Sequence, residues 1–127
     1  MRFARVVFLI AGIWGLLLLT PLYFIFDAIG RKDPPPITHP AFYYGFVGAG
    51  LAWQIAFLMI AKHPVRLRYV MIPAVIEKFT YGIAMLVLYS QARVNKVDMG
   101  FAGVDLLLGV LFIIAFLTTR DESAAHP

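Results

Sequence analysis

The chain has 127 residues, of which 61% are hydrophobic and 14% are charged, whereas soluble domains average about 45–50% apolar and about 25% charged residues. A soluble protein of this size has too little interior to hide so much apolar surface, so the composition predicts one domain in a lipid bilayer. The absence of cysteine excludes disulfides, thiol redox chemistry and cysteine-ligated zinc. The net charge of +4 is expected in loops beside anionic lipid and does not indicate nucleic-acid binding.

Four segments are long and apolar enough to cross a hydrocarbon core of roughly 30 Å, which takes about 20 helical residues. The predicted spans are residues 3–29, 41–61, 69–90 and 99–119. Pro21 is expected to kink the first span, whose apolar stretch exceeds the roughly 7–15 residues of a cleaved signal peptide. Short loops make sequential helices neighbours, so the predicted fold is an all-α membrane protein, an antiparallel bundle of four transmembrane helices. Residues 1–120 are predicted to form this domain and residues 121–127 a polar, disordered tail.

The distribution of Lys and Arg predicts the orientation in the membrane. The basic residues near one end of the helices are Arg2, Arg5, Lys62, Arg66, Arg68 and Arg120. Those near the other end are Arg31, Lys32, Arg93 and Lys96. This bias predicts that both termini are cytoplasmic, and we expect the membrane to be a bacterial inner membrane.

Glu77 and Lys78 stand side by side in the apolar run IPAVIEKFTYGIAML, residues 72–86. An ionisable side chain at the centre of a membrane costs about 2.5–3.5 kcal/mol, so each of the two needs an explanation. Adjacent helical residues do not face each other, and we expect these two to point in different directions. The favoured interpretation of Lys78 is that its long side chain snorkels to the inner interface.

Glu77 is predicted to face the bundle interior or a wet cavity, because its helical face is small and polar. The other residues of that face are Pro73, Thr80, Tyr81 and Ala84. Tyr81 is placed to donate a hydrogen bond to Glu77, and Gln54 and Trp53 lie at a similar depth on the second span. Two interpretations stay open, namely a hydrogen-bonded clasp between the second and third helices and a binding or proton-carrying site.

Asp105 is a second intramembrane acid, about 9 Å from the outer end of the fourth span. The favoured interpretation is an interfacial carboxylate held by tyrosine hydroxyls or by Lys78 reaching outward. The alternative makes Asp105 and Glu77 the outer and inner acids of one polar path, very roughly 10 Å apart in depth.

The remaining features are less specific. Small residues repeat every four positions on two faces of the second span, and such faces favour helix packing or dimer formation. These residues are Ala41, Gly45 and Ala49 on one face and Gly48, Ala52 and Ala56 on the other. The histidines lie in loops or in the tail with no metal-ligand spacing, so no metal, cofactor or catalytic residue is predicted.

The layout was compared with three families of this size. Small multidrug resistance transporters carry an acid in the middle of the first helix, whereas residues 3–26 contain none, and the signature of fluoride channels is absent. With its segments FYYGFVGAGLAWQ and PAVIEKFTYG, the chain resembles the DoxX-like small bacterial membrane proteins. The resemblance implies a compact four-helix bundle with scattered intramembrane polar residues, and no activity or functional residue is carried over from it.

The predicted function is to bind, and in one version to transport, a lipid-like or small hydrophobic molecule at a polar site around Glu77. The candidate ligand-binding residues are Glu77, Gln54, Tyr81, Asp105, Lys78 and Trp53. A non-catalytic accessory or structural subunit of a larger membrane complex is one alternative, and a membrane-embedded enzyme acting on a lipophilic substrate is another. The expected partners are the lipid bilayer, a lipid-like ligand, and a second copy or larger complex packed on the small-residue faces of the second span.

Overall fold

The computed structural model describes residues 2–32 and 37–119, and every regular element in these two ranges is helical. In chain order the elements are α1 (Arg2–Leu19), the 3₁₀ turn η1 (Thr20–Tyr23), α2 (Phe26–Lys32), α3 (Pro40–Lys62), the 3₁₀ turn η2 (Arg68–Val70), α4 (Met71–Ser90) and α5 (Lys96–Thr118). The stretches long and apolar enough to cross a membrane are Arg2–Tyr23, Pro40–Lys62, Arg68–Ser90 and Lys96–Thr118. The chain is therefore an integral membrane protein of the all-α class with four transmembrane helices, as predicted. Arg120 and the predicted tail at 121–127 lie outside the described residues.

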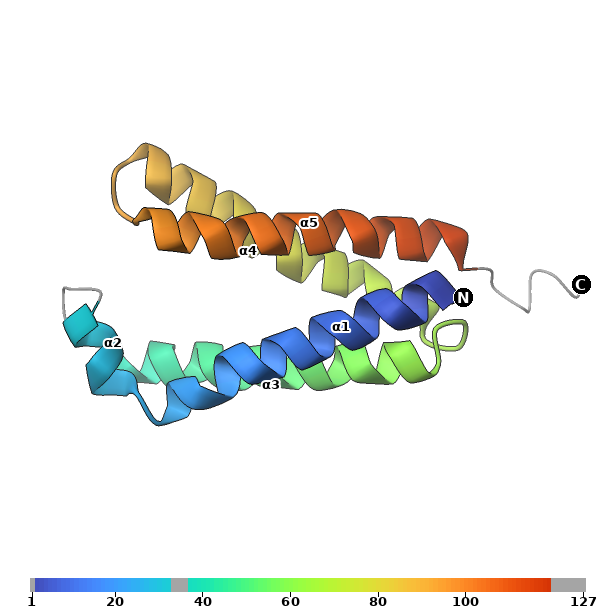
Figure 1. Ribbon diagram of the computed structural model, residues 1–127, viewed down its shortest axis with the longest axis horizontal. Coiled ribbons are helices and arrows are strands. Elements are labelled where there is room, and N and C mark those ends of the chain that lie inside the picture. The colour runs from blue at the N-terminus through green and yellow to red at the C-terminus, as the bar shows by residue number, and fades with distance from the viewer. Residues whose placement is uncertain (1, 33–36, 120–127) are drawn as a thin grey trace, which may run out of the picture.

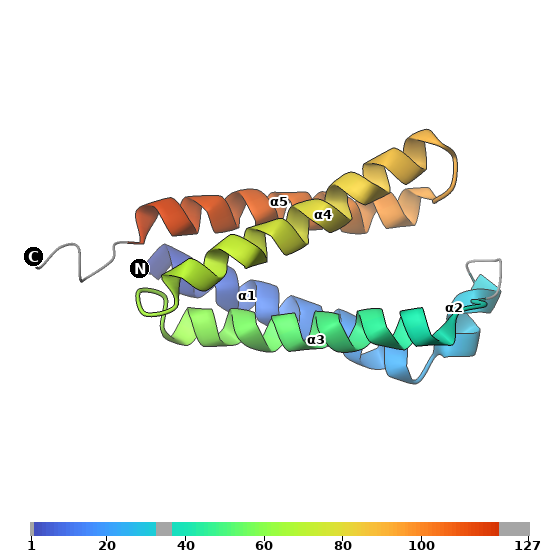
Figure 2. The same cartoon turned by 180° about the vertical axis from the view of Figure 1, so that it is seen from behind.

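The four long helices form two antiparallel pairs. One pair is α1 with α3 and the other is α4 with α5, and α1 also packs against α5. Figures 1 and 2 show that the pairs converge at the end where α1 begins and α5 ends, and diverge at the end that carries α2. The consecutive helices α3 and α4 make little contact, so the molecule differs from a closed bundle in which all sequential helices are neighbours. It is a wedge with a closed end and an open end.

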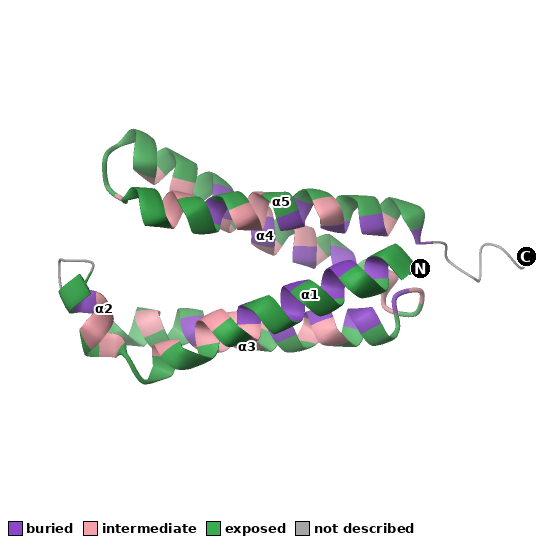
Figure 3. Cartoon of the chain, in the orientation of Figure 1, coloured by how far each residue is buried: buried purple, intermediate pink, exposed green. Residues whose placement is uncertain are grey.

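Aromatic rings hold the closed end together. The rings of Phe8 in α1 and Phe112 in α5 stack with centroids 4.1 Å apart, and the Phe57 ring of α3 packs at 5.9 Å from the first and 5.1 Å from the second. All three side chains are fully buried. Figure 3 shows many of the buried residues toward this end. Because lipid is as apolar as these rings, their close packing, and not their removal from water, joins the two pairs.

Arg68 ties the beginning of α4 to the end of α5 at the same closed end. Its Nε donates a hydrogen bond to the carbonyl oxygen of Phe116 at 3.0 Å, and its guanidinium lies 3.9 Å from the centroid of the Phe116 ring. The last carbonyls of a helix lack helical partners and carry partial negative charge, so a cation here stabilises the end of α5.

The first predicted span, residues 3–29, is wrong beyond residue 23, because the chain breaks where a kinked helix was expected. The α-helix ends at Leu19, Pro21 lies in the 3₁₀ turn, and a separate helix, α2, begins at Phe26. Proline has no amide hydrogen and its ring clashes with the preceding turn, which ends the α-helix. The hydroxyl of Tyr43 in α3 donates to the carbonyl oxygen of Leu22 at 2.5 Å and so satisfies a group that the break sets free.

The turn between α4 and α5 carries two local signals. Ala92 has a φ of 57°, and the amide of Arg93 donates to the carbonyl of Leu88 at 2.9 Å, the pattern that ends many helices with a left-handed residue. Asn95 and Asp98 then form a reciprocal capping box, so α5 begins at Lys96, before the predicted start at residue 99.

Candidate functional site

The space between the two helix pairs forms a cleft of about 340 Å³, which lies within the usual size range of small-molecule sites. Its apolar walls consist of Trp14, Leu18, Leu19, Leu22, Ile29, Phe46 and Phe101. Its polar side chains are Gln54, Glu77, Lys78, Tyr81 and Asp105. Trp14, Phe46 and Phe101 are each 38% exposed or more, so the walls are accessible from outside the protein. The cleft has the composition of a ligand pocket, apolar with a few polar groups at one place.

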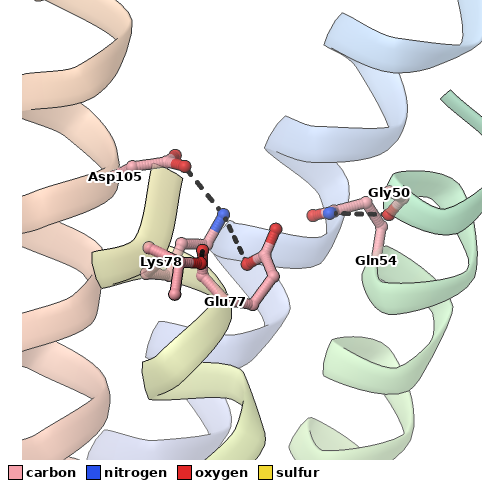
Figure 4. Close-up of polar contacts among 6 residues, drawn as sticks. Gly50, Gln54, Glu77, Lys78 and Asp105 are labelled. Atoms are coloured by element: carbon pink, nitrogen blue, oxygen red, sulfur yellow. Dashed lines mark hydrogen bonds and ion pairs between the residues drawn. The ribbon is translucent and has the colours of Figure 1, made fainter. Parts of the chain in front are cut away.

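Glu77, Lys78 and Asp105 form a charged triad in the cleft (Figure 4). The Nζ of Lys78 lies 3.4 Å from Oδ1 of Asp105 and 3.6 Å from Oε2 of Glu77. The Lys78 side chain is 6% exposed, against 28% for Glu77 and 18% for Asp105. Two acids on neighbouring helices therefore share one buried ammonium group.

These contacts correct three predictions. Lys78 does not snorkel to the inner interface, because the pairing of α4 with α5 places Asp105 beside it and supplies a buried counter-charge. The ends of Glu77 and Lys78 meet although their first side-chain bonds diverge, since both side chains are long enough to bend. The two acids are not separated by about 10 Å of depth, because both contact the same nitrogen. Asp105 is held by Lys78, which was one of the two kinds of partner expected for it.

The buried stripe of α4 differs from the predicted one. The buried residues of this helix are Met71, Ala74, Lys78 and Gly82, whereas Thr80 and Ala84 of the predicted inner face are exposed. Ala74 and Gly82 lie four residues on either side of Lys78, and small residues at this spacing allow close helix packing. This small-residue pattern was present in the sequence and would have placed Lys78 inside the bundle.

Gln54 stands on the opposite wall of the cleft from the triad (Figure 4). It is 2% exposed, and its Nε2 donates to the carbonyl oxygen of Gly50 in its own helix at 2.9 Å. Its Oε1 finds no hydrogen-bond partner in the described part of the chain. The side chain lies against Gly15 of α1, where a methyl group would collide with it. Gln54 and Glu77 form no hydrogen bond among the described residues, so the hydrogen-bonded clasp, one of the two interpretations left open, is not formed at these residues.

The structure brings together five of the six predicted site residues. Tyr81 lines the cleft, but no hydrogen bond joins it to Glu77 within the described ranges. Trp53 lies outside the cleft and packs against Phe57, with ring centroids 6.2 Å apart. The aromatic wall residues Trp14, Phe46 and Phe101 were not predicted, because only the pairing of the helices shows that they face a common space.

The cleft combines acceptor oxygens and fixed charges with an apolar surrounding, so it can orient one polar group of a molecule that is otherwise apolar. Among residues 2–32 and 37–119, no three histidine or acidic side chains come together in a way that could hold a metal ion. Comparisons with protein-family models, curated proteins and solved structures give no match for this chain, so the resemblance to DoxX-like proteins stays a prediction.

Proposed function

We propose that the protein binds a lipid-like or small hydrophobic molecule in the cleft between its two helix pairs. The observation that carries this proposal is a cleft of about 340 Å³ whose walls are apolar and accessible and whose charged residues are held on one side. An apolar body in the cleft would contact the walls, and one polar group would reach the partly exposed side chain of Glu77, with the buried side chain of Gln54 on the opposite wall.

The hydrogen bonding of these two residues favours a ligand site over a helix clasp. A clasp requires polar groups that pair across helices, because an unpaired polar group inside a membrane is costly. Instead, Oε1 of Gln54 has no hydrogen-bond partner among the described residues, and Oε2 of Glu77 meets only the ammonium group of Lys78 on its own helix. The polar groups of Gln54 and Glu77 therefore do not join α3 to α4.

Photochemical labelling in phosphatidylcholine vesicles tests the proposal. The probe is a long-chain primary alcohol with a diazirine in its chain, and labelled peptides are mapped by mass spectrometry. We expect labelling of the cleft walls to exceed labelling of lipid-facing residues of the same molecules. Gly50→Phe adds a ring to the lining of the cleft, and its Cβ displaces the Leu19 side chain, which would lie 2.8 Å away. The matched change Gly45→Phe, on the same helix, adds its side chain where no neighbouring atom lies within 4 Å of the Cβ.

The expected result is that Gly50→Phe reduces labelling of the cleft walls about tenfold while Gly45→Phe leaves it unchanged. Equal labelling of cleft and lipid-facing residues in the unaltered protein would refute the proposal. So would equal effects of the two substitutions.

An accessory or structural role is the second candidate, and one observation favours it. Ala41, Gly45 and Ala49 of α3 are exposed, and nothing in the chain lies within 4 Å of a methyl group added at Gly45. A helix of a second copy or of another membrane protein would fit against such a face. This role predicts that a protein co-purifies in fixed ratio from native membranes and that Gly45→Phe, but not Gly50→Phe, releases it.

We also propose that the membrane is a bacterial inner membrane, as the layout resemblance suggests, with both termini in the cytoplasm. The bias of Lys and Arg supports this orientation, which places the closed end of the wedge inside. The chain has no cysteine, so single cysteines can report the topology. In intact cells a membrane-impermeant maleimide should modify a cysteine introduced at Gln91, and one at His63 only after permeabilisation. The reverse pattern would overturn the orientation.

A further inference from the structure

In the charged triad the two acids are partly exposed and the base is buried. Of the three side chains, Glu77 and Asp105 are 28% and 18% exposed, whereas Lys78 is 6% exposed. A molecule that enters the cleft therefore meets carboxylates before it meets the ammonium group. We infer that the ligand is a cationic amphiphile, with a protonated amine or quaternary ammonium group that binds at Glu77 and an apolar body that fills the cleft. This inference rests on the proposed function and names its ligand class.

The balance of charges favours a cation. Two carboxylates share the ammonium of Lys78, and the other residues that line the cleft, from α1, α2, α3, α4 and α5, carry no charge. When both acids are ionised, this part of the described chain holds one uncompensated negative charge. In an apolar surrounding such a charge attracts a cation far more strongly than it would in water. An anionic headgroup would meet repulsion at the same place.

The acceptor oxygens of the cleft favour a donor. Oε1 of Gln54 is buried without a hydrogen-bond partner among the described residues, Oε2 of Glu77 meets only the ammonium group of Lys78, and both side chains line the cleft. The amide orientation follows from the structure, because Nε2 of Gln54 is used by the carbonyl of Gly50. A protonated primary amine has three N–H donors and no acceptor, so it suits a cleft whose polar side chains include carboxylates and an amide oxygen.

The aromatic lining fits the same class of ligand. Trp14, Phe46, Tyr81 and Phe101 all line the cleft, and aromatic faces attract ammonium groups within about 6 Å of their centroids. The molecule already uses this interaction for an ammonium group, because the Nζ of Lys78 lies 5.3 Å from the centroid of the Phe57 ring. A ligand ammonium near Glu77 would have aromatic rings around it in the same way.

The test compares three photoactivatable probes that differ only in the headgroup. A long-chain diazirine amine, the matching alcohol and the matching carboxylic acid are each added at pH 7 to the full chain in neutral phosphatidylcholine vesicles. The readout is the ratio of label on the cleft walls to label on lipid-facing residues, which corrects for the partitioning of each probe into the bilayer. We expect this ratio to be about tenfold higher for the amine than for the alcohol, and lowest for the acid.

Substitutions test which residue causes the preference for the amine probe. Glu77→Gln should remove the preference for the amine over the alcohol, because it removes the accessible charge and keeps the shape. Asp27→Asn is the matched control, since Asp27 lies in the first turn of α2 and does not line the cleft, and it should keep the full preference.

The possible failures are distinguishable. If the alcohol and the amine label the cleft equally, or if the acid labels it best, the cationic ligand is refuted while the binding cleft stands. If no probe favours the cleft over lipid-facing residues, the proposed function itself fails. The probe series uses the unaltered protein, so it tests the preference for a cationic ligand even if Glu77→Gln does not fold.

Discussion

Replacing Lys78 by methionine should strongly destabilise the protein. The substitution keeps the length of the side chain and removes the ammonium that lies 3.4 Å from Asp105 and 3.6 Å from Glu77. At an effective dielectric constant of about 20, each of these contacts represents about 5 kcal/mol of Coulomb attraction, most of which offsets the cost of taking the charges out of water. Without the lysine, two acids stand together in an apolar surrounding. We therefore expect a loss of about 3–5 kcal/mol, as for other buried ion pairs from which one partner is removed.

The free energy of unfolding can be measured by titrating the detergent-solubilised protein with sodium dodecyl sulfate while following helical circular dichroism. Lys62→Met is the matched control, because Lys62 ends α3 and is exposed, and it should change stability by less than about 0.5 kcal/mol. Asp105→Asn added to Lys78→Met removes one of the two stranded acids and should recover part of the loss. If Lys78→Met alone costs less than about 1 kcal/mol, the ammonium does not hold the two acids and the account of the triad is wrong.

Two further predictions concern positions where one methyl group decides the outcome. Ala92→Gly should stabilise the protein by about 1 kcal/mol, because a φ of 57° strains alanine but not glycine. The control Ala84→Gly, at an exposed helical position, should instead destabilise the protein by a similar amount. A loss of stability in Ala92→Gly would contradict the left-handed conformation of this turn. Gly15→Ala should destabilise the protein by about 1–3 kcal/mol, because the added methyl group collides with the Gln54 side chain. In the control Gly45→Ala the methyl group meets no neighbour, so this change should be neutral or slightly stabilising. Equal effects of the two changes in the same unfolding titration would argue against close packing of α1 on α3.

The sequence was sufficient for the membrane class and for the number of spans. Length and hydropathy of single segments determine these, and neither depends on how the helices pack. The end of the first span was harder to place. A proline in a membrane helix is compatible with a kink or with a break, and the break at Pro21 is stabilised by a hydrogen bond from Tyr43, a residue of another helix.

The site was only partly predictable, because it depends on which helices pair. Glu77 and Asp105 stood out as acids in apolar runs, but their common partner became clear only from the packing of α4 on α5. That packing relies on Gly82, where the Leu106 side chain fits, and on Gly109, where the Phe79 ring fits. A lysine that faces lipid would be expected to snorkel to the interface. The prediction is wrong for Lys78 because this face of α4 is covered by the rest of the protein.

The position of the Phe8, Phe57 and Phe112 rings has a mechanical consequence. Because they join the two helix pairs near one end, each pair is an arm fixed at its base. A rotation of about 10° at the rings would move the far end of an arm about 30 Å long by about 5 Å. The width of the cleft therefore depends on how these three phenylalanines pack.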